Sequence, residues 1–489
     1  MRKAFALFVI LVVCCIAGAF PVGRYLLSEK DRIQYEEHVI LGDKAVAEGL
    51  AVTLGSKMNS QHFWDTAYVI GGQPEAQSSY RYYGERHYER ATGYYGNGVN
   101  FGSFPNFGSS GGGIDSIGES TGFGAAYRAL AEETKAGETK HRTVPISEYF
   151  TYYPIWLEIE TYSFDYTYSD AFWGGATERI PKEERDAVSK AFTEFFKVPV
   201  MEGEVYTITV TKDAKGTVSE LHGEPGGDGT DSFHWWMETV WDDEYIYFTF
   251  QPYSNGGKEM NTDLIPGGFG IYRLPYSLGE DGIYHVRAGE LTTIIPLEKE
   301  VMKREAYLEL NADGDIVMAT GDESFVFFTV YDRTSWEVKQ SLKIERSSEE
   351  ELYIAHFADD FVVCSFGSKQ LMVLDWNEER GYELKFIVPI AEKSLLWQAV
   401  QSYRGKRDYD WNGEQLAVVT YGTAGYDENG FWMRAYDTDF SVTIYDASGE
   451  IYLAEYLSSQ HTGLERKNMS RYFSGYRCEN NAAIEIKWK

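Results

Sequence analysis

The segments YLEL (Tyr307–Leu310), IVMAT (Ile316–Thr320), FVFFTVY (Phe325–Tyr331) and the run from Glu337 to Ile344 decide the fold. They are rich in β-branched and aromatic residues and are separated by turn residues, a pattern typical of short strands. The turn Asn311-Ala-Asp-Gly-Asp315 joins the first two segments as a tight hairpin would. We therefore predict four antiparallel strands between 307 and 344.

The same grouping recurs along the chain. A second set contains Leu352–Phe357, Phe361–Ser365, Leu371–Leu374 and Tyr382–Ile390, a third contains Gln415–Tyr421, Phe440–Tyr445 and Ile451–Leu457, and an earlier one contains Tyr245–Phe250, Gly270–Leu274 and Leu291–Pro296. In three sets an aspartate follows the third strand: Asp332, Asp375 and Asp446. Four antiparallel strands every ~40–50 residues are typical of a β-propeller blade. A β-sandwich is the alternative, but it does not explain the grouping in fours.

The predicted fold is all-β and β-propeller-like, with four-stranded antiparallel blades over 238–489. Residues 28–237 are predicted to be an irregular β-rich part, either inserted blades or a separate β domain. Within that part, 91–124 is rich in Gly and Ser and is expected to be a long loop. Two helices are expected, over 181–197, where Pro181 precedes acidic residues, and over 124–135.

The N-terminus indicates export. Arg2 and Lys3 precede an apolar run from Ala4 to Phe20, which is typical of a signal sequence. We expect residues 1–27 to be an uncleaved transmembrane signal anchor, with the N-terminus inside the cell and the bulk of the chain outside. The alternative is a signal peptide that is cleaved before Phe20, which would give a secreted protein. A third possibility is a lipoprotein that is modified near Cys14 or Cys15.

Charge and cysteine content narrow the function classes. The chain has 75 acidic and 45 basic residues, a formal net charge of −30, which disfavours binding to nucleic acid. Beyond residue 24 the cysteines are Cys364 and Cys478. Cys364 lies in an apolar strand pattern and is expected to be a buried thiol, with a Cys364–Cys478 disulfide as the alternative.

Four sequence blocks carry a resemblance. They are EGLAVTL (48–54), HFWDTAYV (62–69), KAGETKHRTVPISEYFTYYPI (135–155) and IPGGFGIYRLPY (265–276). These blocks resemble a group of uncharacterised, membrane-anchored or secreted β-propeller-like proteins of Gram-positive bacteria, over about 40–457. The resemblance implies export and a propeller-like fold, and it implies no catalytic residue.

Two stretches are candidate sites. The predicted insertions at 392–411 and 422–439 carry residue types favoured at interface centres: Trp397, Tyr403, Trp411, Tyr426, Trp432 and Arg434. The alternative cluster is His234, Trp235, Glu238 and Asp242, close to Trp236, where acids stand beside aromatic platforms as in sugar-cleaving sites.

Other chemistry has weaker support. We expect no cofactor, although the loop 226–231 offers oxygen ligands for calcium at Asp228 and Asp231. The motif Gly118-Glu-Ser-Thr-Gly122 resembles a hydrolase nucleophile elbow, but no hydrophobic strand precedes it.

We therefore expect an extracytoplasmic, membrane-tethered binding module rather than an enzyme, with a cell-surface protein or a glycan as its partner. A carbohydrate-binding or glycan-cleaving enzyme is the alternative.

Overall fold

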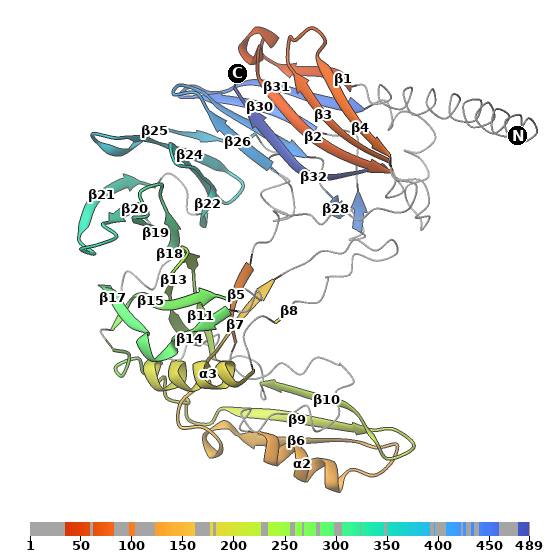
Figure 1. The fold of residues 1–489 in the computed structure, drawn as a ribbon, viewed down its shortest axis with the longest axis vertical. Coiled ribbons are helices and arrows are strands. Elements are labelled where there is room, and N and C mark those ends of the chain that lie inside the picture. The colour runs from red at the N-terminus through yellow and green to blue at the C-terminus, as the bar shows by residue number, and fades with distance from the viewer. Residues whose placement is uncertain are drawn as a thin grey trace, which may run out of the picture. The chain divides into compact units, whose positions relative to one another are not determined.

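The fold is given by a computed structural model. The described residues are 35–58, 62–82, 97–102, 123–161, 177–178, 182–225, 233–254, 260–266, 268–279, 284–297, 306–322, 324–346, 350–391, 396, 407–421, 424–426, 432–434, 440–458 and 478–488. The chain forms two compact units (Figure 1). The first contains residues 1–94, 164–174 and 346–489, and the second contains 95–163 and 175–345. Each unit includes residues from both sides of position 238.

The second unit contains two successive antiparallel sheets. One has the order β12 (Thr239–Trp241), β13 (Tyr245–Thr249), β15 (Phe269–Leu278) and β17 (Thr292–Leu297), with β16 (Tyr284–Val286) paired to the end of β15. The other has the order β18 (Ala306–Leu310), β19 (Ile316–Gly321), β20 (Phe325–Tyr331) and β21 (Val338–Glu345). The two sheets pack through one apolar cluster, to which Tyr247 and Ile271 contribute from the first sheet and Leu308 and Met318 from the second.

The remainder of the second unit is less regular. One three-stranded sheet has the order β10 (Val218–Pro225), β9 (Val205–Lys212) and β6 (Thr139–Pro145), and another has the order β5 (Asn97–Gly102), β7 (Trp156–Thr161) and β8 (Thr177–Glu178). A two-stranded ribbon is formed by β11 (Phe233–Trp236) and β14 (Gln251–Ser254). The helices are α2 (Gly124–Glu133), α3 (Lys182–Phe196) and the short 3-10 helices η4 (Ile146–Glu148) and η5 (Ala288–Glu290). Both predicted helices are confirmed. Because β5 lies within 91–124, the expectation of a continuous loop there is wrong for residues 97–102.

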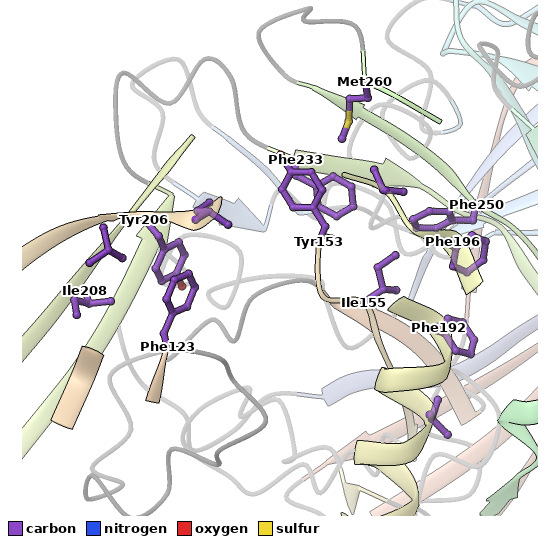
Figure 2. Close-up of a cluster of buried hydrophobic side chains, with 14 of the residues drawn as sticks. Phe123, Tyr153, Ile155, Phe192, Phe196, Tyr206, Ile208, Phe233, Phe250 and Met260 are labelled. Atoms are coloured by element: carbon purple, nitrogen blue, oxygen red, sulfur yellow. The ribbon is translucent and has the colours of Figure 1, made fainter. Parts of the chain in front are cut away.

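Aromatic side chains hold this part of the second unit together. On α3, Phe196 packs on Phe250 at 4.3 Å between ring centroids (Figure 2). It also packs on Tyr272, at 5.1 Å between ring centroids. Next to α2, Phe123 stacks on Tyr206 at 4.7 Å and 4°. The large rings of this core supply apolar area that the short helices and sheets do not offer separately.

The first unit contains three larger sheets. Their orders are β22 (Leu352–Phe357), β23 (Phe361–Phe366), β24 (Gln370–Asn377) and β25 (Gly381–Pro389); β1 (Tyr35–Leu41), β31 (Gly449–Ser458), β30 (Phe440–Asp446), β27 (Leu416–Tyr421) and β26 (Arg407–Trp411); and β32 (Cys478–Lys487), β2 (Ala51–Met58), β3 (His62–Val69) and β4 (Ala76–Tyr82). The unit also has the pair β28 (Ala424–Tyr426) and β29 (Trp432–Arg434), and the turn η1 (Lys44–Ala47). Shared apolar clusters join the first of these sheets to the second, and the second to the third.

The three aspartates occupy corresponding places in three different sheets, as the repeats predict. The register between third and fourth strands shifts between Val330 and Tyr331, between Val373 and Leu374, and between Ile444 and Tyr445. In each sheet the aspartate directly follows the shift. Asp332 and Asp446 make the following turns by accepting backbone N–H groups. The expectation of a turn is wrong for Asp375, which lies inside β24 while Asn377 makes the turn.

Cys364 is a free thiol and is completely buried in β23, whose six residues are all buried. Burial raises the pKa of this thiol to about 12. The expectation of a buried thiol is confirmed, and the disulfide alternative is not what the structure has.

No helix in the described part of the chain is long and apolar enough to cross a membrane. The predicted signal anchor falls within residues 1–34, which lie outside the described residues.

Candidate binding site

The ribbon of β11 and β14 has an inner and an outer face. Because neighbouring residues of a strand point to opposite sides, Phe233 and Trp235 share one face and His234 and Trp236 share the other. Phe233 is 5 % exposed and belongs to the core, and Trp235 packs against it. Trp236 is 61 % exposed. The alternation therefore presents a large aromatic ring to solvent on a short strand.

The inner face fixes the ribbon to the core. The ring of Phe233 stacks on that of Tyr153 at 4.0 Å between centroids and 6° between planes (Figure 2). The backbone N–H of Phe233 donates to the Glu204 carboxylate at 3.3 Å. The Tyr153 hydroxyl also donates to Glu204. These contacts hold β11 in one orientation, so its outer side chains are presented from a rigid support.

The outer face of the ribbon is an aromatic platform, which we define as His234, Trp236 and Tyr253. The rings of Trp236 and Tyr253 are stacked, with centroids 5.5 Å apart and planes 14° apart. His234 lies opposite Tyr253 in the register, with ring centroids 5.7 Å apart. Burial lowers the pKa of His234, which favours the neutral imidazole. The platform thus combines a flat apolar surface with a ring that donates or accepts hydrogen bonds.

Two carboxyl groups lie near this ribbon. One follows β11 in the chain, and the other is on the adjoining sheet that contains β18. Glu238 stands two residues after Trp236, where its backbone N–H donates to the Thr249 hydroxyl at 3.1 Å. Glu309 lies on β18. Burial raises the pKa of Glu238 to about 7, and the negative charge of Glu309 adds to the shift. Burial also raises the pKa of Glu309 to about 7. Near neutral pH this pair can hold or release a proton.

Asp242 is a structural residue of the hairpin between β12 and β13. Its carboxylate accepts the N–H groups of Glu244 and Tyr245, each at 2.8 Å. It also accepts from the Tyr247 hydroxyl at 3.1 Å and pairs with Arg333 at 2.9 Å. The predicted cluster is therefore divided: His234 faces outward, Trp235 faces the core, and Asp242 is engaged in a turn.

The structure corrects the interpretation of Trp411 as an exposed loop residue. Trp411 ends β26 and is 8 % exposed. Its indole N–H donates to Asp375 at 3.0 Å, and its ring lies 5.8 Å from that of Phe386. Tyr409 and Trp411 are buried while Asp408 and Asp410 alternate with them. Burial that alternates every two residues indicates a strand. The prediction of an insertion over 392–411 did not take this alternation into account.

Of the other predicted loop residues, three lie on described strands and two do not. Tyr426 lies opposite Trp432 in the register of β28 and β29, and Arg434 lies opposite Ala424. Trp397 and Tyr403 lie outside the described residues. The structure therefore does not bring these residues together as one described surface.

The predicted metal ligands Asp228 and Asp231 and the serine motif at 118–122 also lie outside the described residues. Within the described ranges, no group of three or more His, Cys, Asp or Glu side chains is arranged to hold a metal ion. The loop at 311–315 is a hairpin turn, as expected, in which Asn311 accepts the N–H groups of Asp313 and Asp315.

The sequence reasoning missed Tyr253 and Glu309. Tyr253 lies in the segment Gln251-Pro-Tyr-Ser254, where Pro252 weakens a strand pattern. Glu309 stands in the middle of YLEL, and alternation alone indicates that its side chain leaves the apolar face. No local signal places it near Glu238.

No protein-family model matches this chain, and no curated protein matches it. Among solved structures, the chain is similar to the Dos1 propeller, with 12% identity, a TM-score of 0.21, and coverage of 52% of this chain and 75% of that chain. It is also similar to a hypothetical selenium-binding protein from Sulfolobus tokodaii, with 10% identity, a TM-score of 0.25, and coverage of 84% and 91%. A protein from Lactobacillus plantarum has 11% identity, a TM-score of 0.20, and coverage of 60% and 87%. Similarities at these TM-scores carry no argument about fold or function.

Proposed function

We propose that this chain is a β-propeller-like binding module that holds a glycan on the aromatic platform of His234, Trp236 and Tyr253. The observation that carries the proposal is the exposed ring of Trp236, stacked on Tyr253 and supported by a buried inner face. Trp and Tyr rings, which combine an apolar face with a polar edge, are enriched at binding interfaces.

Four features support blades of a propeller. Consecutive strands form antiparallel sheets with the first strand at one edge. Sheets adjacent in sequence pack on each other within each unit. A register shift recurs between third and fourth strands. The C-terminal strand β32 completes the sheet of β2, β3 and β4, which brings distant parts of the chain together as closing a ring requires.

The chemistry of the platform favours a sugar. A pyranose ring offers a face of C–H groups that packs on an indole, and hydroxyl groups at its edge that pair with an imidazole. The neutral form of His234 is able both to donate and to accept such hydrogen bonds. An aromatic surface of a partner protein is the competing occupant.

We also propose that the module is tethered outside the cell by its N-terminal apolar run. The support is the sequence Arg2, Lys3 and Ala4–Phe20. Fractionation of cells expressing the full chain tests this proposal. Recovery in the membrane fraction supports an anchor, and recovery of all the protein in the medium, beginning at Phe20, contradicts it.

The test of glycan binding is retention of the full chain in native gels containing soluble glucan, mannan or chitin oligosaccharides. Trp236→Ala is expected to weaken binding about thirtyfold, the cost of a truncated interface aromatic at ~2 kcal/mol. Tyr82→Ala is the matched control, since Tyr82 is 43 % exposed on another strand. Equal binding by the Trp236 variant overturns the proposal, as does failure of all the sugars to retard the wild type.

A glycan-cleaving activity is the second candidate, and Glu238 with Glu309 is the observation that favours it. A carboxylic acid with a pKa near 7 is suited to protonate a leaving oxygen. Release of reducing ends from a retained glycan, abolished in both Glu238→Gln and Glu309→Gln, supports cleavage. Binding without release at any pH from 5 to 8 leaves the protein a binding module.

A further inference from the structure

Arg273 on β15 is a cation without an anionic partner among the described residues. Its guanidinium lies over the ring of Tyr245, 4.6 Å from the centroid, and 5.6 Å from the ring of Trp336. Its Nε atom is buried and has no hydrogen-bond partner. A buried donor that no group satisfies costs free energy, so its retention calls for an explanation.

The position of Arg273 is unusual within the repeat. The register between β15 and β17 shifts between Ile271 and Tyr272, and Arg273 follows directly. The corresponding residues of three other sheets are Asp332, Asp375 and Asp446. This sheet therefore carries a positive charge where those three carry a negative one.

The two rings around Arg273 are held in place by their own turns. Trp336 has a φ of +60°, a backbone conformation that costs a non-glycine residue about 1–3 kcal/mol. Its N–H donates to the Asp332 carbonyl at 2.9 Å, which maintains the turn. The N–H of Tyr245 donates to Asp242 at 2.8 Å. The guanidinium thus lies over two rings whose backbones are held by hydrogen-bonded turns.

Neighbouring charges are already matched. Asp242 pairs with Arg333 at 2.9 Å and accepts from the Tyr247 hydroxyl. Asp315 pairs with Lys339 at 2.7 Å, and Lys339 also contacts Asp332 at 3.1 Å. Arg273 belongs to none of these described pairs.

We propose that Arg273, whose guanidinium lies over the rings of Tyr245 and Trp336, receives the carboxylate of an acidic ligand such as a uronic acid or a small organic acid. A planar carboxylate matches the guanidinium fork in shape and in charge. One unpaired cation matches one negative charge, whereas a phosphate dianion would bring a surplus charge close to Asp242. The proposal does not depend on glycan binding at the platform.

The experiment measures binding of sodium glucuronate, glucose, acetate and inorganic phosphate to the full chain at constant ionic strength. The readout is the arginine Nε–H resonances in selectively labelled protein, which report contact with Arg273 directly. Glucuronate is expected to shift the resonance that is missing from Arg273→Gln, and glucose is expected to leave it in place. Acetate distinguishes a small organic acid from an acidic sugar as the ligand. If acetate shifts the Arg273 resonance as much as glucuronate does, the site binds carboxylates in general. If acetate shifts it less, the site prefers an acidic sugar.

The variants make the test specific. Arg273→Gln is expected to weaken glucuronate binding at least tenfold. Arg273→Lys keeps the charge without the fork and is expected to weaken it severalfold. Arg287→Gln is the control, because Arg287 is exposed and pairs with Glu290 at 3.2 Å. Three results overturn the proposal: unchanged binding by Arg273→Lys and Arg273→Gln, equal binding of glucose and glucuronate, or tighter binding of phosphate.

Discussion

Trp411 joins two sheets of the first unit. It packs on Phe386 of β25 and donates to Asp375 of β24 from its own place on β26. Trp411→Ala is expected to lower the free energy of unfolding by about 3–5 kcal/mol, because it removes a large buried ring. Urea denaturation measures this loss. Trp236→Ala is the companion variant, and since Trp236 is exposed its effect is expected to stay within about 0.5 kcal/mol.

If Trp411→Ala leaves the urea midpoint unchanged, Trp411 is not a core residue. Trp411→Phe separates the two contributions, since it keeps a ring and removes the N–H donor. Asp375 retains Lys385 at 2.9 Å in that variant, so a smaller loss of about 1–2 kcal/mol is expected.

Glu309 and Glu238 give the stability a pH dependence. Burial raises the pKa of both groups to about 7, from 4.5. Between these values the folded state holds more protons than the unfolded state, so the contribution of the pair to stability falls as pH rises from about 4.5 to about 7. Glu309→Gln removes one titrating group. Relative to wild type, its unfolding free energy is expected to rise by about 2–3 kcal/mol across this range and then level off. If the difference in unfolding free energy between wild type and variant stays the same at every pH, the raised pKa of Glu309 is contradicted.

At the scale of elements, Glu37 fastens β1 to β31. Its carboxylate accepts from the hydroxyls of Tyr452 at 3.1 Å and Tyr456 at 2.9 Å, and it pairs with Lys44. Glu37→Ala is expected to cost about 2–3 kcal/mol, because it removes an acceptor shared by two buried hydroxyls. Hydrogen exchange measures the result as faster exchange of the β1 amides.

The matched control for that prediction is the neighbouring position. Glu36 is on the other face of β1, is exposed, and contacts only His38 among the described side chains. Glu36→Ala is expected to leave exchange in β1 unchanged. Equal exchange rates in the two variants would show that Glu37 does not hold the strand.

The strand sets from 306 onward were predictable because their central strands are continuous buried runs. Every residue of Ile316–Gly321 and of Phe361–Phe366 is buried, so composition alone marks them as strands. β1 and β32 were not predicted, since the stability of each comes from a distant partner: β1 pairs with β31, and β32 pairs with β2. Local propensity does not encode such pairing.

The site was predictable in composition and not in arrangement. Glu238 and His234 were found from their aromatic neighbours. The inward direction of Trp235 and the outward direction of Trp236 depend on the register with β14. The role of Asp242 depends on Arg333, which lies on the turn after β20. Contacts of this kind arise between elements that are distant in the chain, and local sequence patterns do not contain them.

At the scale of the whole molecule, the C-terminal strand β32 completes a sheet with three strands from the start of the first unit. It pairs with β2 from Ala51 opposite Lys487 to Met58 opposite Cys478. The N–H groups of Ile486 and Trp488 donate to Asp408 and Asp410 at 2.9 and 2.5 Å. Removing residues 478–489 is expected to leave 35–82 and 350–458 open to protease while 123–345 stays protected. Limited proteolysis with mass spectrometry measures this. Uniform resistance of the shortened chain would contradict the role of β32, and Lys487→Ala, an exposed position, is the control.

The pairing of β2 with β32 also sets an order of events during synthesis. Ala51 and Lys487 are 436 positions apart, so at about 5–20 residues per second roughly 20–90 s separate their emergence from the ribosome. Throughout that interval one edge of β2 has open backbone donors and acceptors, and other chains can pair with it. The second unit, 95–163 and 175–345, is complete well before then. The nascent protein is therefore expected to need a holding chaperone at its N-terminal hairpin. Slowing translation anywhere between codons 58 and 478 should increase aggregation, whereas slowing it before codon 51 should not.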